Sequence, residues 1–466
     1  MTNEHFDLII IGAGSGNSII NSAMDHWKIA IIERETFGGT CLNKGCIPSK
    51  MFVLPAEIAH DARAAKKLGV DASVNSVDWP SIVERVFGRI DPIAKGGERY
   101  RESLPNVTVF HGNATFTGNK KLVVDMPGAP TVEITGDRIV LAAGARSFVP
   151  DIPGLDAINW HTSDTIMRLP SLPSRLVIVG GGFIAAEMAG VFAGFGSQVT
   201  IVNRSGRLLM IEDDDVSQRF TNVAREYLNV VTGAQALAVS PNDDGSFTLD
   251  VTTAMGDVSV EADVLLIAAG RTPNGAQLGV ELTGVGLDAK GNVITDEHLV
   301  AAPGIWALGD IRGRHQLKHW ANLEAKIVQH NLLHPESPRV VPDNKPVPYA
   351  VFSHPQIGAI GLTERAAMRD QIPHIVITHE YRHTAYGWAL EDVTSFVKLL
   401  ADPTGTYLLG AHIIGPQAPT LVQLLVQGMH LGNTVSQMAH DVIYIHPALS
   451  EVVEQALLKV LETVAS

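Results

Sequence analysis

The 466-residue chain is poor in cysteine, with only Cys41 and Cys46, and also poor in charged residues. Charged residues make up 18%, against about 25% in typical globular proteins, which excludes a disordered or coiled-coil chain. The longest apolar runs, at residues 8–11 and 264–269, are far shorter than the roughly 20 residues of a membrane-spanning helix. The net charge is -14 without a dense basic run, which argues against a nucleic-acid-binding surface.

The two cysteines lie close together, which is the most informative feature of the composition. A secreted, disulfide-stapled fold would contain more cysteines, and the N-terminus has no basic n-region, so we expect a cytoplasmic protein. A close pair in such a protein is typically redox-active or metal-binding. Zinc needs four ligands, and although His60 is a possible contributor, the usual ligand spacings are absent. A redox pair is favoured, and no metal site is expected.

The chain opens with a strand, glycine turn, helix and strand. Residues 6–11 form an apolar run, GAGSGN follows, residues 18–25 suit a helix, and residues 28–32 suit a second strand. Gly12 permits the tight turn, and Gly14 allows backbone N–H groups to approach a pyrophosphate. The pattern predicts a dinucleotide-binding unit.

Two further residues bear on this first unit. Glu33 follows Gly12 by 21 residues, at the end of the second strand, where a carboxylate accepts hydrogen bonds from a ribose. Asn17 occupies the position of the usual third glycine, which weakens the motif taken alone.

A second unit of the same kind follows, and it predicts a second dinucleotide site. Residues 176–179 form a strand, GGGFIAAE contains Gly180 and Gly182 and opens a helix, and residues 198–202 form the next strand. Ala185 stands at the third glycine position, which the pattern allows.

The end of this next strand indicates the cofactor. Asn203 stands where an acidic residue would bind a free 2′-hydroxyl, and Arg204 and Arg207 are able to pair with a 2′-phosphate. We therefore expect NADPH rather than NADH.

The Cys41–Cys46 spacing limits the local backbone. A disulfide requires Cα atoms roughly 4.4–6.8 Å apart, which residues i and i+5 of a regular helix do not reach. Gly45 and Pro48 supply an irregularity, and a helix from Ser49 onward would place the cysteines near its N-terminus, where thiolates are favoured.

The C-terminal part has a different pattern. Proline-rich stretches at 150–173 and 335–348 suggest boundaries. Strand-like runs begin near residue 350, and helical periodicity follows at 420–431 and 451–461, which predicts an α+β terminal domain.

At this point a family resemblance is clear. GGTCLNKGCIPSK closely resembles the active-site motif of the flavin-dependent pyridine nucleotide-disulfide oxidoreductases, and LAAGARS, IAAGRTPN, GIWALGD and YIHPALSE resemble further motifs of that family. The resemblance covers essentially the whole chain. It implies an α/β fold with two Rossmann-like dinucleotide-binding domains, for FAD and NADPH, and a C-terminal α+β dimerisation domain. The implied domains are 1–149 for FAD and the redox disulfide, 150–271 for NADPH, 272–342 completing the FAD domain, and 343–466 for the dimer interface.

The resemblance also implies roles for single residues. Cys41 would meet the substrate and Cys46 would contact the flavin. Lys50, ion-paired to Glu187, would lie beside the flavin, and Phe183 would cover the nicotinamide pocket.

Other implied roles concern the cofactor chains and the dimer. Asp310 would bind the ribityl chain of FAD. His446, oriented by Glu451, would act as general acid and base across a homodimer interface, a role that suits imidazole. The further residues expected to bind cofactors are Ser15, Gly16, Gly39, Thr40, Ala143, Gly144, Ile184, Gly270, Arg271 and Gly309.

Several segments are similar to those of family members that reduce the disulfide of mycothiol. They are GSGNSI, CIPSKMFVLPAEIA, VFGRIDPIAKGGERYR, HTSDTIMR, LKHWANLEAKIVQHNLL, AYGWALED and YIHPALSEVVEQALL. The expected substrate is therefore a small-molecule disulfide. One departure concerns the phosphate site, because the NADPH-type pattern has a further arginine where this chain has Met210.

Three alternatives remain open: an NAD-dependent dihydrolipoamide dehydrogenase, a glutathione reductase, and a redox-inactive flavoprotein that senses NADPH. Asn203 and Arg204 argue against the first, and the intact Cys41, Cys46 and His446 argue against the last. Mercuric reductase and high-mass thioredoxin reductase are excluded because the chain has no C-terminal cysteine pair.

Overall fold

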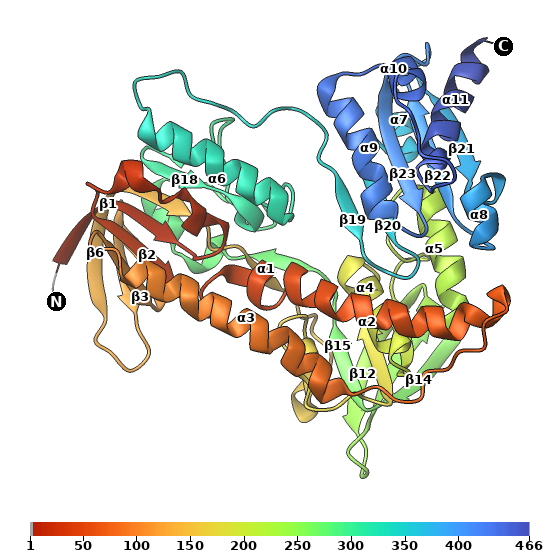
Figure 1. Cartoon of the computed structure of the whole chain (residues 1–466). Helices are drawn as coiled ribbons and strands as arrows, with labels where there is room; N and C mark the ends of the chain where they lie inside the picture. The colour runs from red at the N-terminus through yellow and green to blue at the C-terminus, as the bar shows by residue number, and fades with distance from the viewer. Residues whose placement is uncertain (1–2, 466) are drawn as a thin grey trace. The chain divides into compact units, whose positions relative to one another are not determined.

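The computed structural model describes residues 3–465, which form two compact units (Figure 1). Unit 1 contains the chain up to Ser49, then Pro80–Phe148 and Gly270–Asn344. Unit 2 contains Lys50–Trp79, Val149–Ala269 and the chain from Lys345 onward. Within residues 3–465, no helix has both the length and the apolar character that a membrane crossing requires.

Unit 1 is built on a mainly parallel sheet. Its strands, in spatial order, are β17 (Val300–Ala302), β18 (Ile305–Ala307), β6 (Val132–Leu141), β1 (Asn3–Ile11), β2 (Ile29–Glu33) and β3 (Val107–His111). β17 is the antiparallel edge strand. Residues 29–32 of β2 are all buried, as expected for a parallel strand with both faces covered.

The two faces of this sheet belong to separate cores. Ile9 and Ile11 of β1 face one cluster, while Leu8 and Ile10 face the other. Helix α6 (Lys318–Leu333), cyan in Figure 1, contributes Val328 to the second cluster. Unit 1 also contains nearly all of α3 (Trp79–Glu102), the antiparallel pair β4 (Asn113–Gly118) and β5 (Lys121–Asp125), and the short pair β7 (Ala145–Ser147) and β16 (Arg271–Pro273).

The helix expected at residues 18–25 is wrong. The chain instead forms two 3₁₀ turns, η1 (Ser15–Ile19) and η2 (Ser22–Met24). The Asn21 side chain accepts a hydrogen bond from the Ala23 N–H at 2.9 Å, and the Ser18 hydroxyl donates to the Ser15 carbonyl at 2.7 Å. Such local bonds compete with the α-helical pattern.

Unit 2 contains the second parallel sheet. Its order is β11 (Asn229–Thr232), β10 (Gln198–Asn203), β9 (Arg175–Val179), β15 (Val264–Ile267) and β8 (Trp160–His161). It is accompanied by helices α4 (Phe183–Gly194) and α5 (Asp214–Tyr227) and by an antiparallel sheet of β12 (Ala234–Pro241), β13 (Phe247–Thr253) and β14 (Gly256–Ala262). The second expected pattern of strand, glycine turn, helix and strand is therefore confirmed, and the first is confirmed except for its helix.

The C-terminal part of unit 2 is an antiparallel sheet. Its order is β19 (Tyr349–Val351), β20 (Ile357–Gly361), β23 (Leu408–Ile414), β22 (Phe396–Ala401) and β21 (Ile375–Glu380). Val397 and Leu399 of β22 share one core with α9 (Ala418–Leu431), α10 (Val435–His440) and α11 (Glu451–Ala465). Lys398 points to the other face and pairs with Asp213 and Glu364. The predicted α+β arrangement is confirmed, and two short helices, α7 (Glu364–Arg369) and α8 (Ala385–Ala389), complete it.

Candidate active site

The two cysteines form a disulfide between two consecutive helices. Cys41 lies in α1 (Gly39–Asn43), Cys46 is the first residue of α2 (Cys46–Ala64), and their Cα atoms are 4.7 Å apart. The chain turns at Gly45, where an added Cβ would meet the Thr40 carbonyl oxygen at 2.9 Å. The predicted break is confirmed, although α2 begins three residues earlier than Ser49. The helix N-terminus favours a thiolate at Cys46.

Asn43 holds this loop, a role that the sequence analysis missed. Its side-chain amide donates to the carbonyls of Thr36, Phe37 and Gly39 at 3.1, 2.9 and 3.1 Å. Its position between the two cysteines of the CLNKGC motif was the available signal in the sequence.

In unit 1, the first glycine turn leaves room only for backbone. Gly12 has φ +106°, and an added Cβ would meet the Ala142 carbonyl oxygen at 2.3 Å. A Cβ on Gly39 would meet the Gly14 Cα at 2.6 Å. The Glu33 carboxylate ends β2 and accepts a hydrogen bond from the Ala13 N–H at 2.8 Å. This close backbone crossing with an acid at the strand end fits a dinucleotide.

A lysine that the sequence analysis did not select also lies at this turn. Lys318, the first residue of α6, donates to the Ser15 hydroxyl at 2.9 Å, and Ser15 donates to the Asn322 side chain at 3.2 Å. Gly16 follows within η1, where an added Cβ would meet the Ala142 side chain at 2.6 Å. Gly16 therefore has no space for a side chain, and Ser15 is fixed by its hydrogen bonds, as the close approach of a cofactor to the backbone requires. Thr40 lies in α1 beside Gly39.

The remaining expected residues of unit 1 lie near the paired strands β7 and β16. Asp310 lies 3.8 Å from Arg271, and burial raises the pKa of Asp310 while Arg271 opposes that rise. Asn274 ties the neighbouring segment together by donating its side-chain amide to the Ala143 carbonyl at 2.8 Å and its backbone N–H to the Gly144 carbonyl at 3.0 Å. Asn274 is the last residue of the IAAGRTPN motif, but the motif alone gave it no separate role.

Gly270 and Gly309 are fixed by different hydrogen bonds. Gly270 has φ +132° and accepts the Phe148 N–H at 2.9 Å. The Gly309 N–H donates to Glu324, a buried carboxylate of α6, at 2.6 Å. Glu324 also pairs with Arg312, so the turn that carries Asp310 is fixed by an ion pair.

In unit 2, the second glycine turn resembles the first. Gly180 has φ +133°, and an added Cβ would meet the Ala268 carbonyl oxygen at 2.2 Å. Gly182 caps α4, and an added Cβ there would meet nothing within 4 Å. Phe183 and Ile184 begin the helix, and Phe183 is 40% exposed. The open space at the helix N-terminus fits a phosphate group.

Lys50 and Glu187 form a close ion pair, as the resemblance implied. The Lys50 ammonium lies 2.8 and 2.7 Å from the two oxygens of Glu187, which is only 4% exposed. The Phe352 N–H donates to the same carboxylate at 3.0 Å, and Lys50 lies over the Phe352 ring at 4.7 Å. Because the buried carboxylate is fully bonded, the lysine is held in one position.

At the end of β10, Asn203 is a structural residue. Its side-chain amide is buried and donates to the carbonyls of Ser205 and Arg207 at 3.1 and 2.8 Å. Arg204, next in sequence, is exposed and has no hydrogen-bond or ion-pair partner among residues 3–465. The end of β10 therefore carries one cationic side chain without a partner, that of Arg204, and no acidic side chain.

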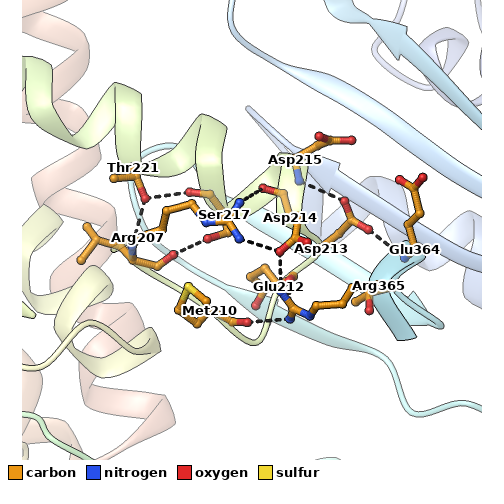
Figure 2. Close-up of polar contacts among 12 residues, drawn as sticks. Arg207, Met210, Glu212, Asp213, Asp214, Asp215, Ser217, Thr221, Glu364 and Arg365 are labelled. Atoms are coloured by element: carbon orange, nitrogen blue, oxygen red, sulfur yellow. Dashed lines mark hydrogen bonds and ion pairs between the residues drawn. The ribbon is translucent and has the colours of Figure 1, made fainter. Parts of the chain in front are cut away.

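The two other arginines here share one acid (Figure 2). Arg207 pairs with Asp214 at 2.7 Å, and Arg365 of α7 pairs with the same oxygen. Arg365 also donates to the backbone carbonyl of Met210 at 2.8 Å, so a guanidinium contacts the residue at which the related pattern has an arginine. Arg365 was not predictable from the local sequence, because it lies 155 residues beyond Met210.

His446 and Glu451 form the last predicted pair. The Nδ1 of His446 lies 2.7 Å from Glu451, and the side chain of His446 is 73% exposed. Its Nε2 has no partner in the described part of the chain. The neighbouring Ile443 and Ile445 are 97% and 75% exposed. The geometry holds the imidazole by one nitrogen and leaves the other available.

Comparisons with known proteins identify the family of this chain. Residues 6–325 match the family model described as pyridine nucleotide-disulphide oxidoreductase, and residues 347–457 match its dimerisation domain. The chain belongs to the pyridine nucleotide-disulphide oxidoreductase family. Members of this family use FAD and a nicotinamide nucleotide, and the two glycine turns fit these groups.

Individual relatives align over nearly the full length. A mycothione reductase of Mycobacterium tuberculosis is 44% identical over 98% of this chain and 99% of its own. A dihydrolipoyl dehydrogenase of Chlamydia trachomatis is 32% identical over 98% and 97%. The HOCl-induced flavoprotein disulfide reductase RclA from Escherichia coli has a similar structure, with a TM-score of 0.84, 28% identity, and coverage of 97% and 99%.

Proposed function

We propose that this protein reduces mycothione, the disulfide of mycothiol, to mycothiol at the expense of NADPH. The observation that carries the proposal is the Cys41–Cys46 disulfide at the start of α2, in a chain that is 44% identical to a mycothione reductase over 98% of its length. We assign the activity to the cytoplasm, where it would contribute to redox homeostasis.

Each cofactor has a set of candidate residues. Gly12, Gly14, Glu33 and Asp310 would hold FAD, within residues 1–149 and 272–342. Gly180, Gly182 and Arg204 would hold NADPH, within residues 150–271. When bound, the two cofactors supply the electron pair that reduces the Cys41–Cys46 disulfide.

The thiols then perform two disulfide exchanges. The Cys41 thiolate attacks one sulfur of mycothione, forms a mixed disulfide and releases one mycothiol. The Cys46 thiolate attacks the Cys41 sulfur, releases the second mycothiol and restores the protein disulfide. Two electrons pass from the dithiol to the substrate, and the two departing thiolates take up two protons.

His446 would supply those protons. Glu451 binds its Nδ1 at 2.7 Å, so the free Nε2 is the atom that donates. We propose that residues 343–466 form a homodimer interface and that His446 acts in the partner subunit's site. The exposed Ile443 and Ile445 beside it support this, because an interface would cover them.

Lys50 and Phe183 would position the cofactors. Lys50, held by Glu187, would contact the flavin with a fixed positive charge, and Phe183 would cover the nicotinamide pocket.

The decisive experiment is a substrate and cofactor matrix. Purified, FAD-loaded protein is assayed for oxidation of NADPH and NADH with mycothione, glutathione disulfide and lipoamide. We expect a strong preference for NADPH with mycothione. Activity with NADH and lipoamide would instead indicate a dihydrolipoyl dehydrogenase. If the reduced protein lacked the charge-transfer absorption between thiolate and flavin, a redox-inactive sensor would be favoured.

A further inference from the structure

Arg101 of α3 is a buried cation without an anionic partner. It is 9% exposed, and its guanidinium donates to the side chain and the carbonyl of Asn17 at 2.7 and 2.8 Å. No carboxylate pairs with it among residues 3–465. Burial lowers the pKa of Arg101, and the neighbouring Tyr100 opposes that shift.

Buried charges in proteins are normally paired, because their desolvation is costly. Two carboxylates on the same helix, Glu98 and Glu102, instead lie 3.0 and 3.8 Å from His111. Arg101 thus pairs with neither of these acids, and three of its five N–H groups have no acceptor in the described structure. Arg101 therefore retains N–H groups that could bind an anion.

The location of Arg101 indicates which anion it would bind. Asn17 is the third residue of η1, directly after the glycine turn of the first nucleotide unit. In a regular unit, a helix N-terminus stabilises the cofactor diphosphate through its dipole and free N–H groups. Here that helix is replaced by a five-residue 3₁₀ turn, so fewer peptide dipoles are aligned.

A second cation approaches the same turn. Lys318 donates to Ser15, the first residue of η1, and none of the described carboxylates lies within 4 Å of its ammonium group. Burial lowers the pKa of Lys318, and Asp310 opposes that effect from a longer distance. Arg101 and Lys318 therefore bring two positive charges to η1 from α3 and α6.

We propose that Arg101 and Lys318 bind the diphosphate of FAD and replace the electrostatic contribution of the missing helix. This inference concerns the cofactor and does not depend on which disulfide the protein reduces. Arg101 is the sharper test, because its removal takes away a charge that nothing in the apoprotein compensates.

The test measures FAD binding to apoprotein by quenching of flavin fluorescence. Arg101→Gln retains a donor for Asn17 and should weaken FAD binding by about tenfold to a hundredfold, the loss of one or two charge-assisted contacts. Arg101→Lys should recover part of the affinity. Arg99→Gln is the matched control, since Arg99 is exposed on the same helix and makes no ion pair in the described structure.

Two further measurements separate cofactor binding from a structural role. ADP and adenosine compete for the apoprotein, and Arg101→Gln should weaken competition by ADP but not by adenosine. The apoprotein of Arg101→Gln should melt at or above the wild-type temperature, because a buried unpaired charge has been removed.

Three outcomes would overturn the inference. One is FAD affinity within twofold of wild type, and another is a destabilised apoprotein with equal losses for ADP and adenosine. The third is a wild-type apoprotein that fails to bind FAD, which would also overturn the cofactor assignment. If mycothione is not reduced while FAD affinity falls as expected, only the proposed substrate fails.

Discussion

The buried Glu212 gives a prediction about stability and pH. Its side chain is fully buried, one oxygen accepts a hydrogen bond from the Tyr349 hydroxyl at 3.0 Å, and the other has no partner in the described structure. Burial, with a smaller contribution from the charge of Asp213, raises the pKa of Glu212 from 4.5 to about 7. We predict that Glu212→Gln stabilises the protein in alkaline solution and much less in acid.

The sign follows from proton binding. Between pH 4.5 and about 7 the folded protein keeps a proton on Glu212 that the unfolded chain has released, so stability falls as pH rises through this range. Each pH unit corresponds to about 1.36 kcal/mol, so the loss amounts to about 3 kcal/mol above pH 7. The glutamine variant has no such loss.

The assay is urea unfolding followed by tryptophan fluorescence, at about pH 5 and about pH 8.5, with equal protein concentration and FAD loading. The advantage of Glu212→Gln over wild type should be at least 2 kcal/mol larger at the higher pH. Tyr349→Phe is a useful companion, because loss of the hydroxyl donor should steepen the pH dependence. A difference that is constant with pH would refute the reasoning.

Three further predictions concern the site. Cys41→Ser and Cys46→Ser should each abolish disulfide reduction while retaining FAD, because exchange needs both sulfurs; flavin absorbance and turnover check this, and residual turnover would contradict it. His446→Gln should lower kcat by about 10²-fold to 10⁴-fold, since glutamine cannot transfer the proton; near-normal kcat would argue against a catalytic role. Arg204→Gln should raise KM for NADPH about tenfold and leave KM for NADH unchanged, because only the 2′-phosphate contact is lost; equal effects on both would contradict the assignment.

The sequence predicted the parallel strands and glycine turns well, for a physical reason. Strands buried on both faces must be apolar without interruption, as residues 29–32 are, and a tight crossing at a positive φ requires glycine, as at Gly12 and Gly180. The pairs Lys50–Glu187 and His446–Glu451 were found only because neighbouring motifs resemble those of a family.

The contacts that the sequence could not predict join residues far apart in the chain. Arg365 reaches Met210, and Arg101 reaches Asn17 across 84 residues. No local sequence pattern identifies such residues, because the sequence around a helical arginine does not show whether its side chain is solvated or buried. The helix expected at 18–25 failed for a local reason, the competing side-chain bonds of Ser18 and Asn21.

Asn203 shows how a residue can determine specificity through structure. In the sequence, Asn203 was notable because it stands where an acidic residue would bind a free 2′-hydroxyl. In the structure, its buried amide donates to the carbonyls of Ser205 and Arg207. A Cβ on Gly181 would meet the side chain of Asn203 at 2.4 Å. A carboxylate at this position could not donate those bonds and would face two carbonyl oxygens. The asparagine therefore offers a 2′-hydroxyl only a neutral amide oxygen in place of a carboxylate, and it also forms the turn that leaves Arg204 exposed. We therefore expect a preference for a 2′-phosphate to depend on the whole turn, so that exchanging Asn203 for an acid would not by itself convert the site to NADH.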